Sequence, residues 1–187
     1  MSKIGGSVLR VISGSARGKK LITSEGLDVR PTLDRVKESV FNIIAFDIPD
    51  ACVLDLFSGS GSLGIEALSR GAGECTFVDK SAQSITVTKK NLEATHLVDL
   101  SSVINTDSIE FIKSTSKKFD IIFIDPPYES ALYDKSLKAI KEAGILNDDG
   151  FIVLEYDTVT TPDFSTDSFK VVKDKKYGRV KILIMKE

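Results

Sequence analysis

Residues 54–64 read LDLFSGSGSLG, an apolar run that ends in a loop of alternating serines and glycines. Gly59, Gly61 and Gly64 fit the pattern G-x-G-x-x-G, in which glycines let the backbone approach a ligand closely and the following helix N-terminus favours an anion. Asp79 lies eighteen residues after Gly61, at the end of the next apolar run, where its carboxylate can accept hydrogen bonds from ribose hydroxyls. The stretch predicts a loop for a nucleoside-containing cofactor. By itself it leaves NAD and S-adenosylmethionine open.

Short apolar runs and helical patterns alternate on both sides of this loop. Near-continuous apolar strands that alternate with helices indicate a parallel sheet covered on both faces. We therefore expect an α/β, Rossmann-like domain whose mostly parallel, seven-stranded sheet ends in an antiparallel edge strand. The predicted strands are 53–57, 75–78, 102–104, 121–124, 151–155, 169–173 and 180–185, and the predicted helices of this part are 63–69, 82–94, 109–113 and 132–143.

The N-terminal part follows a different pattern. Residues 8–30 alternate loosely around a basic, glycine-containing segment at 14–18, which predicts a β-hairpin. Arg30-Pro31-Thr32 then predicts a helix start with Thr32 as the cap, and Ile48-Pro49-Asp50 its end. We expect residues 1–48 to form an N-terminal extension and residues 49–187 one compact catalytic unit.

Composition excludes several classes of protein. The chain has 187 residues, 42% hydrophobic and 28% charged, which is typical of one globular domain. No apolar run approaches the roughly 20 residues of a spanning helix, and residues 1–6 contain no secretory signal, so we expect a cytoplasmic protein without membrane partners. Cys52 and Cys75 predict small buried thiols, and His96 an exposed side chain, so neither a metal site nor a hydrolase triad is expected.

Charge is distributed unevenly along the chain. The net charge is −2, yet residues 1–38 contain eight Lys and Arg against four Asp and Glu. A basic arm on an acidic body suggests that the arm meets an anion, although an ordinary solvated surface is the alternative.

Asp125-Pro126-Pro127-Tyr128 follows the fourth core strand directly. The tetrapeptide resembles the D/N-P-P-Y/F signature of methyltransferases that modify a nitrogen conjugated to a base ring or an amide. Consecutive prolines fix their φ angles and donate no backbone hydrogen bonds, so they can hold the Pro126 carbonyl toward the site. That carbonyl and the Asp125 carboxylate would accept both hydrogens of an amine, and Tyr128 would stack on an extruded base.

The resemblance covers essentially the whole chain. Residues 11–21 (VISGSARGKKL), 30–42 (RPTLDRVKESVFN) and 54–64 are similar to three motifs of the RsmD-type 16S rRNA (guanine-N2)-methyltransferases. The first stretch departs modestly, since it starts Val-Ile where the family has Ile-Ile. The second and third stretches together are highly specific, whereas D-P-P-Y is shared by many nitrogen methyltransferases.

The resemblance implies methyl transfer from S-adenosylmethionine to the N2 amine of a guanine in 16S rRNA or a small-subunit precursor, without a metal, by a monomer. Asp125, Pro126, Pro127 and Tyr128 are the expected catalytic residues. The expected cofactor-binding residues are Asp55, Phe57, Ser58, Gly59, Gly61, Asp79, Lys80, Asp107, Ser108 and Asp125, and the expected RNA-binding residues are Arg17, Lys19, Lys20, Arg30 and Arg35.

Other functions remain possible from the residues alone. Related signatures serve methylation of adenine in DNA or of a protein glutamine, against which the N-terminal motifs argue. An NAD(P)-dependent oxidoreductase and a non-catalytic RNA-binding protein are the alternatives of other classes. Only about 60 residues follow the fourth strand, which is short for a second nucleotide-binding half plus a substrate domain.

Overall fold

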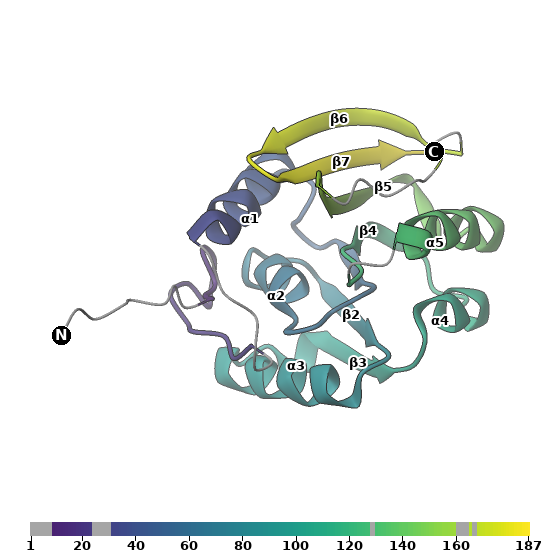
Figure 1. Ribbon diagram of the computed structural model, residues 1–187. Coiled ribbons are helices and arrows are strands. Elements are labelled where there is room, and N and C mark those ends of the chain that lie inside the picture. The colour runs from purple at the N-terminus through teal and green to yellow at the C-terminus, as the bar shows by residue number, and fades with distance from the viewer. Residues whose placement is uncertain (1–8, 24–30, 128–129, 160–164, 166–167) are drawn as a thin grey trace.

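The computed structural model describes residues 9–23, 31–127, 130–159, 165 and 168–187 (Figure 1). Its centre is a seven-stranded sheet of order β3-β2-β1-β4-β5-β7-β6. The first five strands of this order are parallel, and β7 runs antiparallel to both β5 and β6. The strands are β1 (Cys52–Asp55), β2 (Glu74–Asp79), β3 (Ser101–Asn105), β4 (Phe119–Ile124), β5 (Leu146–Asp157), β6 (Lys170–Tyr177) and β7 (Val180–Lys186).

Helices cover both faces of the sheet, as the apolar strands require. Buried side chains of α1, α2 and α3 share one hydrophobic cluster with one face, and those of α4 and α5 share a second cluster with the other. Figure 1 shows the sheet between these two groups. The helices are α1 (Pro31–Ile43), α2 (Ser62–Ser69), α3 (Ala82–Thr95), α4 (Ser108–Ser114) and α5 (Ser130–Ala143), with a short 3₁₀ helix, η1 (Val98–Leu100).

The predicted α/β class and the seven strands are confirmed. The antiparallel strand is β7, which pairs with β5, while β6 forms the outer edge. β5 is longer than the predicted 151–155, because its first residues pair with the start of β4 through a register shift between Phe119 and Ile121. None of the described helices is long and apolar enough to cross a membrane.

The predicted N-terminal hairpin is confirmed in its antiparallel pairing but not as two regular strands. Within residues 9–23, one isolated antiparallel bridge joins Arg10 to Lys20, and no regular strand forms. The two sides of the hairpin are joined by backbone hydrogen bonds: the amide of Val11 donates to the carbonyl of Lys19 at 2.9 Å, and that of Leu21 donates to the carbonyl of Leu9 at 2.8 Å. Its tip also bonds α2, since the amide of Ser15 donates to the carbonyl of Ser69 at 2.8 Å and that of Ala16 to the Ser69 hydroxyl at 2.9 Å. Acceptors on the helix thus add to the hydrogen bonds between the two sides of the hairpin and hold it against α2.

The first helix also differs from its prediction at both ends. α1 begins at Pro31, so Thr32 lies inside the first turn and is not the cap, and the helix ends at Ile43, before residue 48. Proline suits the first helical position because its missing N–H would be unpaired there in any case. Phe41 packs on Phe123 of β4 with ring centroids 5.6 Å apart. The division between residues 1–48 and 49–187 stays a prediction.

Candidate functional site

Four carboxylates lie at the carboxyl ends of four adjacent strands: Asp79 of β2, Asp55 of β1, Asp125 after β4, and Glu155 of β5. Side chains alternate between the faces of a strand, and residues two positions before each acid belong to the cluster on the α1–α3 face. The side chains of the four acids therefore lie on the same face of the sheet; these four residues are called the carboxylate row below. Three of them are predicted site residues, and Glu155 was missed because it reads as the polar end of a buried strand.

The serine–glycine loop is attached to this row. The amide of Gly59 donates to Asp79 Oδ2 at 2.8 Å, and the Thr88 hydroxyl donates to the Gly59 carbonyl at 3.0 Å. Gly61 adopts a left-handed conformation, φ 77°, as the residue that caps α2. A Cβ on Gly64 would lie 2.3 Å from the Phe77 ring, so only glycine lets α2 pack this closely on β2. Asp79 is thus a residue that shapes the loop.

Asp55 is buried beneath the first turn of α2. Its Oδ2 accepts a hydrogen bond from the Gly64 amide at 3.0 Å. The pKa of this carboxyl is raised to about 7, mainly by burial; the Gly64 hydrogen bond opposes the rise, and the charges of Asp125 and Asp79 contribute to it. A cation placed beside Asp55 would relieve this penalty, because an opposite charge favours the ionised form.

Replacement of Asp55 by Asn is expected to stabilise the ligand-free protein. The pKa of Asp55 is about 7 in the fold, above the ordinary 3.8, so folding favours the protonated form. The contribution of this carboxyl to stability is therefore greatest at low pH and is lost as the pH rises from about 4 to about 7. Asn mimics the neutral acid, so the gain in unfolding free energy should be about 2 kcal/mol at pH 8 and smaller at pH 5. Urea unfolding of both proteins at both pH values measures it. Equal gains at pH 5 and pH 8 would contradict the assignment.

Asp79 already uses both carboxylate oxygens within the protein. Besides the Gly59 bond, Oδ1 accepts from the Ser81 amide at 2.8 Å. Asn105 of β3, which sequence reasoning missed, donates to the carbonyls of Asp79 and Lys80 at 2.8 and 3.0 Å and so fixes the turn after β2. Contact of Asp79 with ribose hydroxyls stays a prediction.

The remaining predicted cofactor residues lie around the same edge in different environments. Asp107 caps α4 through Oδ1, which accepts from the Ile109 amide at 2.9 Å, and Ser108 is buried. Phe57 is half-buried and Lys80 is exposed. Ser58 is buried, and its hydroxyl oxygen has no hydrogen-bond partner among the described residues.

The D-P-P-Y segment lies directly beyond β4. Asp125 is accessible to solvent, Pro126 is buried, Pro127 is exposed, and Tyr128 lies outside the described residues. The surrounding strand ends remove part of the hydration of Asp125 and raise the pKa of its carboxyl above the ordinary value. The Tyr133 hydroxyl of α5 donates to the Glu155 carbonyl at 3.0 Å, which ties the helix after this segment to β5.

The basic arm lies against α2 and α3. Arg17, Lys19 and Lys20 are exposed, as is Arg35 of α1, whereas Arg30 lies outside the described residues. Asn91 of α3 connects the arm to the cofactor loop, because its side chain bonds both backbone groups of Ile22 and the carbonyl of Ser60. Ile22 of the arm therefore lies beside the serine–glycine loop.

A buried ion pair anchors the arm and was missed by sequence reasoning. Glu66 of α2 is fully buried, and its carboxylate accepts from the amides of Ile12 and Ser13 at 2.8 and 3.0 Å. Arg70 donates to the same carboxylate at 2.8 Å, and Lys37 of α1 lies 3.5 Å from it. A charged residue inside an otherwise apolar helix was the available signal, because lone acids are seldom fully buried.

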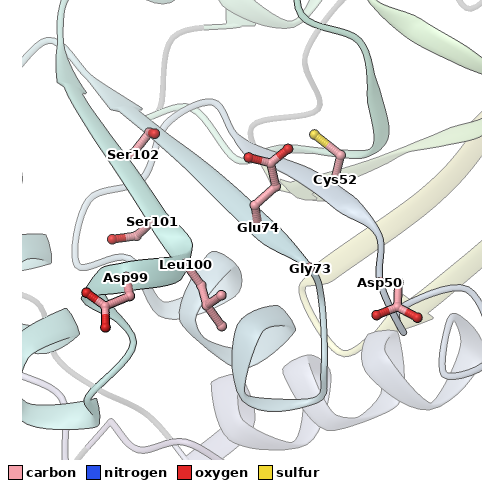
Figure 2. Close-up of a pocket in the computed structure, with 8 residues that line it drawn as sticks. All are labelled: Asp50, Cys52, Gly73, Glu74, Asp99, Leu100, Ser101 and Ser102. Atoms are coloured by element: carbon pink, nitrogen blue, oxygen red, sulfur yellow. The ribbon is translucent and has the colours of Figure 1, made fainter.

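Two pockets lie at the opposite edge of the sheet. A pocket of about 420 Å³ adjoins the starts of β1, β2 and β3 and is lined by Cys52, Glu74 and Asp99 among others (Figure 2). Ligands of open α/β sheets bind beyond the carboxyl ends of the strands, so we assign the site to the carboxylate row and not to this pocket. Cys75 is buried as predicted, but Cys52 is only half-buried; both are free thiols, and His96 is exposed.

Known proteins resemble the chain over nearly its full length. The family model described as Conserved hypothetical protein 95 matches residues 9–186. Ribosomal RNA small subunit methyltransferase D of Haemophilus influenzae is 37% identical over 177 residues, which are 92% of this chain and 90% of that protein. The Bacillus subtilis protein YlbH is 38% identical over 96% of this chain and 99% of its own length. The solved structure of Escherichia coli yhhF superposes with a TM-score of 0.84 at 31% identity, covering 97% of this chain and 99% of that one.

Proposed function

Because this chain belongs to the RsmD-type methyltransferase family, we propose that it transfers a methyl group from S-adenosylmethionine to the exocyclic N2 amine of a guanine in 16S ribosomal RNA. The observation that carries the proposal is the row of Asp79, Asp55 and Asp125 beside a glycine loop, at the edge where such sheets bind ligands. We expect the enzyme to act in the cytoplasm as a monomer, on the rRNA or on a small-subunit precursor.

The charged and polar groups at this edge of the sheet fit S-adenosylmethionine. The cofactor carries a positive sulfonium and a positive ammonium group, which the carboxyl groups of buried Asp55 and its neighbours Asp79 and Asp125 complement electrostatically. The hydroxyl of buried Ser58, which bonds none of the described residues, offers a further polar contact in the same loop. A Cβ on Gly59 would contact only the Phe57 carbonyl oxygen, at 4.0 Å, so the backbone there leaves room for a ligand.

The chain's own residues then orient the amine. The cofactor supplies an activated methyl group, so the protein needs no metal to generate the electrophile. Asp125 and the Pro126 carbonyl accept the two amine hydrogens and direct the nitrogen lone pair toward the methyl donor. Positioning of this kind can contribute about 7–11 kcal/mol to lowering the barrier. The amine becomes acidic only as it is methylated, so no strong base is required beforehand.

A methylation assay tests the proposal. The protein is incubated with radiolabelled S-adenosylmethionine and, in parallel, with 16S rRNA, small-subunit precursor particles, duplex DNA and unrelated protein. We expect label only in the two rRNA samples, as N2-methylguanine after nuclease digestion. Label in adenine or in protein glutamine would replace the substrate assignment, and tight binding of NAD without methyl transfer would replace the reaction.

Replacement of Asp79 by Ala is expected to weaken cofactor binding while the fold persists. Loss of charge-assisted hydrogen bonds to ribose, and of the anchor for Gly59, should reduce affinity by about 1.5–3 kcal/mol. Calorimetric titration with S-adenosylhomocysteine measures this. The matched control is Asp99→Ala, an exposed acid at the opposite edge, which should bind as the parent does. Parental affinity of the Asp79 variant would remove this residue from the cofactor site.

Simultaneous replacement of Arg17, Lys19 and Lys20 by Ala is expected to weaken rRNA binding and flatten its salt dependence. Each phosphate contact contributes about 0.7–0.9 to the log–log slope. Affinity for S-adenosylhomocysteine should not change, because these side chains are exposed on the arm. The control replaces three exposed lysines of the edge strand β6, Lys170, Lys173 and Lys175. A parental slope in the arm variant would assign the RNA to another face.

A further inference from the structure

Glu155 stands level with Asp125 at the carboxyl edge of the sheet. The register pairs Ile124 of β4 with Leu154 of β5, so the residues that follow them lie next to each other on parallel neighbours. Neighbouring strands lie about 4.8 Å apart, which brings the two side chains within reach of one small ligand.

The side chains of Asp125 and Glu155 lie on the same face of the sheet as the cofactor loop. Phe123 and Val153, two positions earlier on the same strands, pack in the cluster beneath α1–α3. The alternation of strand side chains then directs Asp125 and Glu155 to that face. Burial, and after it the charge of Asp125, raises the pKa of Glu155 above its ordinary value, which agrees with this proximity.

Neither carboxylate has a bonding partner among the residues that the structure describes. Within residues 9–23, 31–127, 130–159, 165 and 168–187, no cationic side chain pairs with Asp125 or Glu155, and no hydrogen bond to either carboxylate is formed. The Glu155 backbone is nevertheless fixed, because its carbonyl accepts from Tyr133 and its strand pairs with Ile182 of β7. A half-buried acid that is held in place and whose carboxylate bonds none of the described side chains is suited to bind a ligand.

A guanine presents two adjacent donors on its Watson–Crick edge, the N2 amine and the N1–H. Adenine has an acceptor at N1, so an acceptor placed beside the amine site distinguishes the two bases. We infer that Glu155 is a specificity-determining residue whose carboxylate accepts the N1–H of the target guanine while Asp125 holds the neighbouring amine. The inference rests on the proposed function, since it names how that site selects its base.

The test uses 2-aminopurine, which keeps the 2-amine but has an unprotonated N1. Single-turnover rates are measured with 16S rRNA that carries guanine or 2-aminopurine at the methylated position. The parent should methylate guanine at least about tenfold faster. The Glu155→Gln variant can donate to an unprotonated N1, so its preference for guanine over 2-aminopurine should fall to within about threefold. The Glu155→Ala variant should also lose this preference, because its reaction with guanine becomes slower. Glu142→Gln, at an exposed position of α5, is the matched control and should keep the parental ratio.

The ratio separates recognition from folding, because both substrates report on the same enzyme sample. A parent that methylates both bases equally would overturn the inference and leave the proposed function intact. Unchanged preference in the Gln and Ala variants would reduce Glu155 to a structural residue. A parent that transfers no methyl group to guanine N2 would overturn the proposed function, and the role of Glu155 with it.

Discussion

Replacement of Asp125 by Ala should reduce single-turnover methylation of rRNA about 100-fold or more, because a mispositioned nucleophile loses the advantage of orientation. Asp125 directly follows β4, is accessible to solvent and pairs with no side chain in the part of the chain that the structure describes, so its removal leaves the packing of the sheet intact. The loss should therefore appear in the chemical step. Rapid-quench measurements at saturating cofactor and RNA determine it.

Asn at the same position is the conservative comparison. Its carbonyl still accepts a hydrogen bond, so Asp125→Asn should retain part of the activity that the Ala variant loses. The affinity of the Ala variant for S-adenosylhomocysteine should stay within about threefold of the parent, since its lost group faces the base. A near-parental rate for the Ala variant would refute the mechanism, because no other described acid follows β4 directly.

Replacement of Glu66 by Ala should lower the free energy of unfolding by about 3–5 kcal/mol, because it leaves buried cationic groups without their partner. Lys37 is buried beside this carboxylate, and burial lowers the pKa of its ammonium group. The amides of Ile12 and Ser13 would lose their acceptor as well. Urea unfolding measures the loss, and faster tryptic cleavage after Arg17 reports release of the arm.

A surface pair provides the matched control. Glu74 bonds Lys117 at 2.7 Å, but its side chain is 52% exposed, so Glu74→Ala should cost about 1 kcal/mol or less. A loss of the same size in the Glu66 and Glu74 variants would mean that burial adds nothing to the Glu66 network.

The sequence by itself determined the sheet, its loop and the carboxyl edge where the chemistry lies. These features depend on local rules. Apolar runs mark buried strands, and the left-handed turn before α2 favours glycine at position 61. An acidic residue directly after a parallel strand lies at the edge of the sheet where ligands bind. The same rules placed Asp55, Asp79 and Asp125 on one edge, and the structure confirms that placement. Their roles toward cofactor and base stay predictions.

Only the tertiary structure decided the partners of the arm and the fourth member of the carboxylate row. The arm keeps its hairpin pairing, and the buried Glu66 carboxylate of α2 fixes where that hairpin lies through contacts 53 and 54 residues apart. Glu155 is thirty residues from Asp125 in the sequence, and the parallel register of β4 and β5 makes them neighbours. Such pairings depend on which buried surfaces and hydrogen bonds the whole chain can satisfy together, and no local pattern contains that information.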